Sequence, residues 1–371
     1  MRGDYIMKKS IIILSIIIIS MMPMITAKAG VVAPSNAPDT AINAMRSDTK
    51  AIQSELDKTG QVTLEDGGVY YLSKAIYLSD GDYFDATGAT IYCDTFIFMS
   101  PIGEPNYKSL KNVTLKGGKW RSTIKDGFTK ASFHIRHSRD ITISDMDIQV
   151  SNYEGHTMEF VACKNITVKN CKIMPLGKAK KDSVEEQIQI DIAAPSTATD
   201  TKERTNGGTC DNIKIIGCTV KGCRAICANY AAKDQGKYVN RFHTNITVKN
   251  CKLTGVSSEA LTLSNTTSAT IIGNKIVSNA PSNRRYYAIG CHIAIYGKVP
   301  GKIKKRNLKI TQNEIKGVNY GLLISSSTSS TFNKLTLKNN KLYSKGGAAS
   351  ALSLRSINNI SKSGNNTEQW K

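Results

Sequence analysis

The stretch His156–Ile173, with the sequence HTMEFVACKNITVKNCKI, decides the fold, because the rest of the chain repeats its pattern. It reads as a short strand at 158–160, a polar corner at 163–165 and a second strand that bends at Asn170-Cys171. Apolar and polar residues alternate in both strands, which is typical of a sheet with one buried and one solvent-facing side. Recurrence of this unit along the chain predicts a stack of coils rather than separate domains.

The repeat predicts one short first strand and one longer second strand in each coil. First strands are expected at 96–98, 133–135, 158–160, 188–190, 226–228, 261–263, 293–295, 322–324 and 352–354. Second strands are expected at 112–120, 140–148, 165–173, 212–220, 245–253, 268–276, 307–315 and 334–342. A single coil has too little apolar surface to fold alone, but stacked coils bury one continuous core.

The bend of the second strand carries similar residues from coil to coil. These residues are Gly118, Met146, Cys171, Cys218, Cys251, Asn274, Asn313 and Asn340. Stacked Asn amides are expected to form a hydrogen-bonded ladder, and the Cys side chains to act as small apolar fillers. A second column contains Cys163, Cys210 and His243. Nine cysteines cannot all pair within one chain, and neighbouring parallel strands give poor disulfide geometry, so we expect at most one disulfide, in this second column.

The two ends of the chain depart from the repeat. Residues 1–29 have a basic start, an apolar run and an Ala-Lys-Ala cleavage site, which together indicate a secretory signal peptide. Residues 30–60 are expected to form a linker and a capping helix over the open end of the strand stack. The β-helix is expected to occupy residues 61–357, and residues 358–371 to form a polar C-terminal tail.

The charge of the chain predicts an anionic partner. The formal net charge is +21, and removal of residues 1–29 leaves +18, because that segment holds four basic residues and one acidic residue. In a secreted protein this balance favours an anionic polysaccharide or another anionic surface polymer. Nucleic acid is not expected, since no helix-turn-helix, zinc-finger or RNP pattern is present. We expect a monomer that is secreted or attached to the cell surface and does not bind membrane after signal cleavage.

The pattern resembles the right-handed parallel β-helix of the pectin-lyase-like superfamily. The segment SDTKAIQSEL at 47–56, followed by GQVTLEDGGVYYL at 60–72, is similar to the capping helix and first coil of many bacterial members. The repeated N-I-T-V-K-N-C/N-K-I strand is also typical of them. The resemblance covers roughly residues 39–357 and implies an all-β solenoid with a short helical cap. It implies no particular activity, because the same scaffold serves many functions.

The motifs of two known activities in that superfamily are absent from this sequence. Polygalacturonase-like members carry Asn-x-Asp, Asp-Asp, Gly-His-Gly and Arg-x-Lys, whereas this chain has Gly155-His156-Thr157 and no Asp-Asp pair. The Asp-rich Ca²⁺ set of classical pectate lyases is missing as well. The segments at 156–160 and 186–191 are similar to a group of bacterial secreted β-helix proteins that has no agreed activity.

Outward-facing side chains of the first strands are expected to form rows along the stack, since successive residues of a strand alternate between its two faces. One row is expected to contain Ile97, His134, Glu159, Gln189, Cys227, Thr262 and Ala294. A second row is expected to contain Met99, Arg136, Val161, Asp191, Asn229, Ser264 and Tyr296. The ionisable residues gather on three adjacent coils, which predicts a catalytic group of His134, Arg136, Glu159 and Asp191.

Long connections flank the same coils, at 174–187, 193–211 and 230–244. Insertions in a solenoid often lie on its binding side. Tyr rings there could stack on sugar faces, and cations could meet carboxylates. The residues expected to bind substrate are Gln189, Asn229, His156, Glu186, Lys233, Lys237, Tyr238, Arg284, Tyr286, His292 and Tyr296.

Three functions are compatible with this set of residues. The leading one is hydrolysis of an acidic polysaccharide without a cofactor, with Glu159 and Asp191 as acid and base. Strand geometry puts their backbone origins roughly 8 Å apart, in the range of inverting enzymes. The second is β-elimination of a uronide, with Arg136 or a nearby cation neutralising the carboxylate and Ca²⁺ as an optional cofactor. The third is a glycan-binding or structural β-helix without catalysis.

Overall fold

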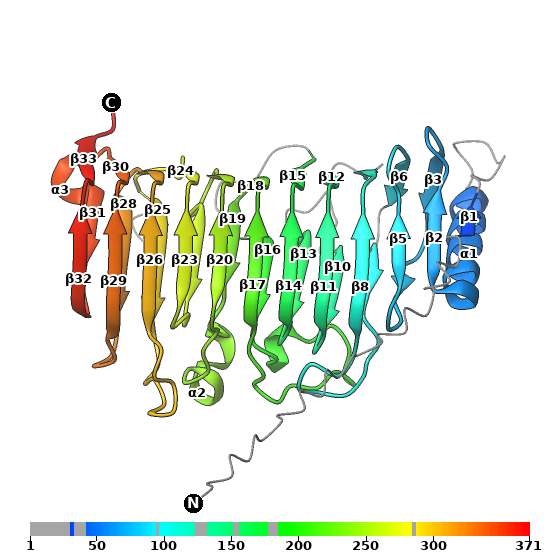
Figure 1. Ribbon diagram of the computed structural model, residues 1–371, viewed down its shortest axis with the longest axis horizontal. Helices are drawn as coiled ribbons and strands as arrows, with labels where there is room; N and C mark the ends of the chain where they lie inside the picture. Colours follow the sequence, from blue (N-terminus) through cyan, green and yellow to red (C-terminus); the bar gives the residue numbers. More distant parts are fainter. Residues whose placement is uncertain are drawn as a thin grey trace, which may run out of the picture.

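The computed structural model describes residues 30–32, 42–93, 96–122, 132–150, 156–176, 185–283 and 287–371. The chain winds through successive coils, and each full coil adds one strand to each of three long parallel sheets (Figure 1). The proposed signal peptide at 1–29 lies outside the described residues, as does most of the linker. Among the helices of the described part, none combines the length and the apolar character needed to cross a membrane.

The three sheets are named here by their number of strands. The twelve-stranded sheet contains β1 (Gly30–Val32), β2 (Gln61–Leu64), β5 (Tyr83–Asp85), β8 (Lys111–Lys116), β11 (Arg139–Ser144), β14 (Lys164–Lys169), β17 (Asp211–Ile216), β20 (Ile246–Lys249), β23 (Ala269–Ile272), β26 (Asn307–Thr311), β29 (Phe332–Lys338) and β32 (Ile357–Ser363). The eleven-stranded sheet contains β3 (Val69–Leu72), β6 (Thr90–Cys93), β9 (Lys119–Arg121), β12 (Asp147–Val150), β15 (Lys172–Pro175), β18 (Thr219–Gly222), β21 (Lys252–Gly255), β24 (Lys275–Ser278), β27 (Glu314–Gly317), β30 (Lys341–Ser344) and β33 (Asn366–Gln369). The ten-stranded sheet contains β4 (Ile76–Tyr77), β7 (Phe98–Met99), β10 (Phe133–Arg136), β13 (Met158–Val161), β16 (Glu186–Asp191), β19 (Arg224–Ala228), β22 (Leu261–Ser264), β25 (Ile289–Ile295), β28 (Tyr320–Ser326) and β31 (Leu352–Leu354).

The predicted repeat is confirmed, with one refinement. The predicted first strands form the ten-stranded sheet, while each predicted second strand is divided between the other two sheets. In the coil of the opening stretch, β14 ends at Lys169 and β15 begins at Lys172. Asn170 between them has a φ of 54°, a left-handed conformation that Asn tolerates and that turns the chain from one sheet into the next.

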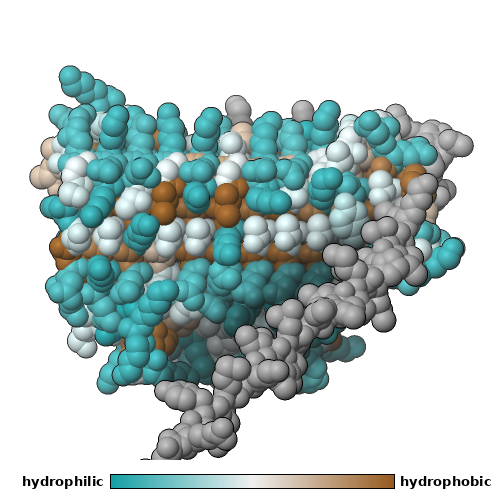
Figure 2. Space-filling model, viewed as in Figure 1, coloured by the Kyte–Doolittle hydropathy of each residue, from teal (hydrophilic) through white to brown (hydrophobic). Residues whose placement is uncertain are grey.

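In-register pairing places residues of the same kind above one another. Inward positions build one continuous apolar core that runs from α1 to the last coils. Outward positions form rows that are visible on the twelve-stranded face (Figure 2). One such row contains Thr114, Thr142, Thr167, Lys214, Thr247, Thr270, Lys309 and Thr336.

The predicted Asn ladder is present at the bend and extends one coil further than expected. The side-chain oxygen of Asn313 accepts hydrogen bonds of 2.9 Å from the backbone N–H and the side-chain amide of Asn274. Asn313 in turn donates to Asn340 over 2.9 Å, and Asn340 donates to Asn365 over 2.8 Å. The buried amides are therefore satisfied by their own neighbours, which is what makes Asn tolerable inside this core.

All nine cysteines lie in the described part of the chain and are buried, and seven of them are free thiols, namely Cys163, Cys171, Cys210, Cys218, Cys227, Cys251 and Cys291. Cys163, Cys210 and His243 form the expected second column: the Cys163 backbone N–H donates to the Cys210 Sγ over 3.2 Å, and the Cys210 N–H to the His243 Nδ1 over 3.1 Å. The thiols act as small side chains that fill the corners and bond neighbouring backbone groups.

The N-terminal helical cap is present as α1 (Ile42–Thr59), which covers the first coils (Figure 1). Its Ile52 and Leu56 join the apolar core, and Gly60, with a φ of 68°, ends the helix. Shorter helices lie in the connections: η1 (Pro195–Thr197), η2 (Ala232–Asp234), α2 (Gln235–Tyr238) and α3 (Ala348–Ala351).

The expectation of a polar tail at 358–371 is wrong. Most of these residues belong to β32 and β33, which extend the twelve- and eleven-stranded sheets by one more strand each. Their polarity is misleading because backbone hydrogen bonds to β29 and β30 hold them, and the outer side of a terminal coil faces solvent. Trp370 packs beside Ala280, Ala288 and Val318 and anchors the end of the chain.

The ladder predicts that Asn313→Ala destabilises the fold by about 2–4 kcal/mol, because it leaves buried amide groups of Asn274 without an acceptor. Chemical denaturation of the mature protein should show this as a lower midpoint. Asn359→Ala is the matched control, since Asn359 is exposed and makes one hydrogen bond, to the backbone of Asn333. Equal losses in the two variants would contradict the ladder's role.

Candidate functional site

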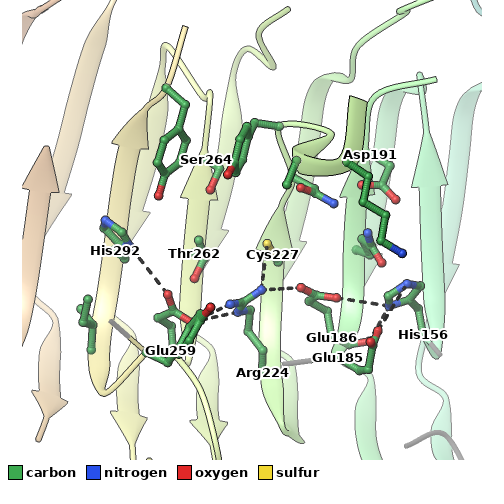
Figure 3. Close-up of a pocket in the computed structure, with 18 of the residues that line it drawn as sticks. His156, Glu185, Glu186, Asp191, Arg224, Cys227, Glu259, Thr262, Ser264 and His292 are labelled. Atoms are coloured by element: carbon green, nitrogen blue, oxygen red, sulfur yellow. Dashed lines mark hydrogen bonds and ion pairs between the residues drawn. The ribbon is translucent and has the colours of Figure 1, made fainter. Parts of the chain in front are cut away.

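A cavity of about 810 Å³ lies on the outer face of the ten-stranded sheet. Its floor consists of outward-facing side chains from β13 through β28, and its wall includes residues that follow β16 and β19 (Figure 3). The predicted site residues that line it are His156, Glu159, Glu186, Gln189, Asp191, Asn229, Lys233, His292 and Tyr296. The strand alternation that predicted an outward row therefore also predicted most of this floor.

The register of the central coils is as predicted: Glu159 lies opposite His134 on one side and Gln189 on the other. Asp191 lies opposite Val161, diagonal to Glu159. The placement of Glu159 and Asp191 on adjacent coils, two residues apart along the strand, is therefore confirmed.

The expected rows are wrong at both ends. Thr262 lies opposite His292 rather than Ala294, and Ser264 lies opposite Ala294 rather than Tyr296. The cause is Cys291, which takes the inward position opposite Leu261 and shifts β25 by two residues relative to the expectation. At the other end, His134 lies opposite Met99 rather than Ile97. There Phe98 pairs with Phe133 inside the core, and Ile97 is buried as well.

His134 is held between two carboxylates. Its Nδ1 lies 2.6 Å from Glu159 Oε2, and its Nε2 lies 2.8 Å from Glu203 Oε1. Burial by itself lowers the pKa of His134, but the hydrogen bonds to the two carboxylates outweigh burial and raise that pKa to about 9. The ring is therefore an imidazolium at neutral pH, and both of its nitrogens donate.

Arg136 is covered in the same way. Its guanidinium forms an ion pair of 3.0 Å with Glu203 and donates to the Thr197 carbonyl over 2.6 Å. Only 3% of Arg136 and 1% of His134 is exposed, and neither lines the cavity. The connection after β16 folds over both residues, so the structure places them beneath the cavity wall rather than in contact with a substrate.

Glu203 was missed by sequence reasoning, because it lies in an irregular connection with no periodic signal. The connection itself holds Glu203 in place: Thr199 donates to it from its backbone N–H over 2.8 Å and from its hydroxyl over 3.0 Å. Tyr238 supports the same connection by donating to the Thr205 carbonyl over 2.6 Å. Tyr238, predicted to bind substrate, is buried and does not line the cavity.

The environments of Glu159 and Asp191 are opposite in character. Burial raises the pKa of Glu159, but the hydrogen bond and charge of His134 outweigh burial, and the pKa is lowered overall. Asp191 is fully buried, and neither of its carboxylate oxygens has a hydrogen-bond partner among the described residues. Burial first, and then the charge of Glu159, raise the pKa of Asp191 well above its ordinary value. The cavity floor therefore holds two carboxyl groups whose pKa values are shifted in opposite directions, lowered for Glu159 and raised for Asp191.

A second ionic network lies at the start of the same strands (Figure 3). The guanidinium of Arg224 bridges Glu186 on one side and Glu259 on the other, with Nη2 2.7 Å from Glu259 Oε2. Burial would raise the pKa of Glu259, but Arg224 outweighs it and lowers that pKa to about 2. Sequence reasoning missed Arg224 and Glu259 although a signal existed, since each stands two residues before an inward residue, as Glu186 does.

The ends of this network contain the two remaining histidines of the cavity. His292 Nδ1 lies 3.6 Å from Glu259 Oε1, and His156 Nδ1 lies 3.4 Å from Glu186 Oε2. His156, Glu185 and Glu186 each offer a potential ligand atom, and these atoms lie within 4.8 Å of one another. That set could hold a divalent cation, although the Glu186 carboxylate is already paired with Arg224.

Two aromatic side chains stack at the other end of the cavity, where β19 and β25 end. Tyr230 and Tyr296 are stacked, with ring centroids 4.2 Å apart and an interplanar angle of 21°. Tyr287 and Tyr320 also line the cavity. Flat rings beside hydroxyl-bearing side chains such as Thr262 suit the faces and hydroxyl groups of sugar rings.

The described part of the lining is not cationic. It contains five acidic side chains, those of Glu159, Glu185, Glu186, Asp191 and Glu259, against three basic ones, those of Arg224, Lys233 and Arg355. Lys237 lies over the ring of Tyr238, 5.2 Å from its centroid, and does not line the cavity. Arg284 and Tyr286 lie outside the described residues.

Comparison with solved structures supports the fold. The chain is similar to the surface adhesin PfbA of Streptococcus pneumoniae, at 15% identity over 86% of this chain and 88% of that chain, with a TM-score of 0.58. A second PfbA structure matches at 13% identity over 92% of this chain and 98% of that chain, with the same TM-score of 0.58. An exopolygalacturonase of Thermotoga maritima matches at 12% identity over 87% of this chain and 88% of that chain, with a TM-score of 0.47.

No protein-family model matches the chain, and no curated protein sequence does. At these identities a structural likeness defines the fold and not the activity. The chain is a right-handed parallel β-helix with a helical cap at its N-terminal end.

The His134 cluster predicts a pH-dependent stability. Because the pKa of His134 rises from 6.5 to about 9 on folding, its contribution is complete below pH 6.5 and is lost as the pH rises through about 9. The free energy of unfolding should therefore fall by up to roughly 3 kcal/mol across that interval in the wild type. In His134→Gln this decline should disappear. Denaturation curves at several pH values measure it, and parallel profiles for the two proteins would contradict the assignment.

Proposed function

We propose that this protein hydrolyses a glycosidic bond of a polysaccharide, with Asp191 as general acid and Glu159 as general base. The observation that carries the proposal is the pair of carboxyl groups with opposed pKa shifts on the cavity floor. A protonated carboxyl can donate to the leaving oxygen while an ionised one activates water, and glycosidases divide the two roles in this way.

The surroundings of the pair suit this division of roles. The imidazolium of His134 keeps Glu159 ionised, while the buried and unpartnered Asp191 carboxyl is a poor place for a negative charge. His134, Arg136 and Glu203 act as positioning residues that hold the charge of Glu159. Inversion of the anomeric centre stays a prediction from strand geometry. It is tested by using NMR to identify which anomer of the product forms first.

The lining favours a neutral sugar at the reacting centre. A uronate carboxylate there would meet the ionised Glu159, whose own cation His134 lies beneath the cavity wall, and neither β13 nor β16 carries a Lys or Arg beside the pair. The β-elimination alternative loses its main support for a related reason, since Arg136 is committed to Glu203. A polysaccharide panel therefore needs neutral as well as acidic polymers.

The acid–base pair predicts that Asp191→Asn and Glu159→Gln each lower kcat/KM by about 10²–10⁴-fold. Wild-type activity should rise with pH through the lowered pKa of Glu159 and fall through the raised pKa of Asp191, which gives a broad optimum that includes neutral pH. Reducing-end release from the panel measures activity. Glu314→Gln, on the eleven-stranded sheet, is the matched control and should stay within twofold of wild type.

The same assay separates the alternatives. Reducing ends without absorbance of unsaturated uronides indicate hydrolysis, and both signals together indicate elimination. Neither signal across a broad panel would favour a binding protein. Full activity of both carboxyl variants would remove these residues from the mechanism.

The aromatic end of the cavity predicts a binding role for Tyr296. Tyr296→Ala should raise KM about tenfold, which corresponds to about 1.4 kcal/mol, and should change kcat by less than threefold. Tyr343→Ala removes a tyrosine from the outer face of the eleven-stranded sheet and should leave KM unchanged. Steady-state kinetics on the polymer that the wild type cleaves decide the point; an unchanged KM for Tyr296→Ala would exclude this subsite.

A further inference from the structure

The positive charge of this protein is concentrated away from the cavity, along the corner where the twelve-stranded sheet turns into the eleven-stranded sheet. Seven exposed lysines of this corner, here called the basic ridge, are Lys169, Lys172, Lys249, Lys252, Lys275, Lys338 and Lys341. Hydrophilic residues follow the upper edge of the face in Figure 2, which is this corner. The ten-stranded sheet, with the cavity, forms the remaining side of each coil.

The ridge consists of two columns that follow the sheet register. In the first column, the strand-initial residues from β15 to β30 are Lys172, Thr219, Lys252, Lys275, Glu314 and Lys341. In the second, the residues near the strand ends from β14 to β29 are Lys169, Ile216, Lys249, Ile272, Thr311 and Lys338. Each column therefore runs along the long axis of the molecule, with one position per coil spacing of about 4.8 Å.

These lysines make few ion pairs within the described part of the protein, although Glu314 lies opposite both Lys275 and Lys341 and interacts with their charges. Among the described residues, only Lys172 of the seven forms an ion pair, at 3.7 Å from Asp147. Glu314, the acidic member of the first column, pairs with Lys316 at 2.9 Å. Lys252 lies directly opposite Lys275, and like charges in that arrangement destabilise a sheet.

The fold itself does not require lysine at these positions. The first column also contains Thr219 and Asn366, and the second also contains Ser363. Both sheets continue through these positions without a break. Protection of an exposed sheet edge does not explain them either, because β21 and β24 are interior strands with a partner on each side. Because neither the fold nor edge protection accounts for these lysines, we look for their role in the binding of another molecule.

We propose that the basic ridge binds an anionic polysaccharide that carries carboxylates and lies along the stack of coils. Lysines recur along both columns at intervals of one to three coils, which are multiples of about 4.8 Å, so the ridge can meet a linear polymer that carries negative charges along its length. Neither column contains an aromatic residue, so the stacking platform that single-stranded nucleic acids use is absent from the ridge. The ridge retains the protein on an anionic matrix, while the cavity on the other side of the coil stays accessible.

The proposal does not depend on the catalytic assignment, since it is scored by binding alone. The test compares the mature wild type with a ridge variant in which Lys169, Lys249, Lys252 and Lys275 are changed to Gln. A control variant carries the same change at Lys298, Lys302, Lys304 and Lys305, which lie in the connection that enters β26 at the far end of its strand. Net charge is equal in the two variants. Binding to immobilised polygalacturonate is measured across a salt series, and circular dichroism and the denaturation midpoint verify folding.

The ridge variant should bind polygalacturonate at least tenfold more weakly, and its log–log salt slope should be smaller by about 3, at roughly 0.7 for each lost contact. The control should stay within twofold of wild type, and neutral dextran should not bind. Equal losses in both variants would show a nonspecific charge effect and overturn the proposal. Tighter ridge-dependent binding to single-stranded DNA or to phosphatidylglycerol vesicles would overturn the choice of a polysaccharide. If the fourfold variant fails to fold, Lys252→Gln/Lys275→Gln must still weaken binding at least threefold for the proposal to hold.

Discussion

Parallel pairing of strands in register is the constraint on which the rest of this molecule depends. It repeats every side-chain position at a spacing of about 4.8 Å, so a residue must tolerate whatever stands above and below it. Asn274, Asn313 and Asn340 meet this demand by bonding one another, and the buried cysteines meet it by being small. Ionic side chains meet it by alternating in sign, as Glu186, Arg224 and Glu259 do on three successive coils.

Asp191 is the exception to that rule, and its position explains why it is a candidate for chemistry. Its neighbours in the row are Val161 and Asn229, so the register supplies no cation, and its oxygens have no hydrogen-bond partner in the part of the chain that the structure describes. An uncompensated buried charge is expensive, so the pKa of Asp191 is raised. Glu159, one coil away, has an imidazolium beside it, and its pKa is lowered. Two chemically equivalent groups thus receive opposite pKa shifts from the identity of their neighbours, which is the basis of the acid–base roles proposed for them.

How far sequence reasoning reached follows from the same constraint. Period-two alternation predicted the strands, the inward core and the outward positions of His134, Glu159 and Asp191, because these depend on local geometry. It failed at β25, because Cys291 fits the core as well as an isoleucine does. Its inward position shifts the row by two residues. It could not predict that Glu203 covers His134 and Arg136, since the connection that holds Glu203 has no period. Polar strands such as β32 were mistaken for a tail because backbone pairing leaves little trace in the side-chain pattern.

The net charge of a sequence does not say where on the molecule the charged side chains lie. A charge of +21 predicted an anionic partner and led to the expectation of cations beside the reacting sugar. The described cavity lining has an excess of carboxylates, while lysines gather on a corner that the cavity does not share. A solenoid permits this separation because its three faces are chemically independent rows on one backbone, so one face can hold a polymer while another acts on it. A basic β-helix therefore need not have an acidic substrate. The ligand that the net charge predicts can bind on one face, while the substrate of the cavity binds on another.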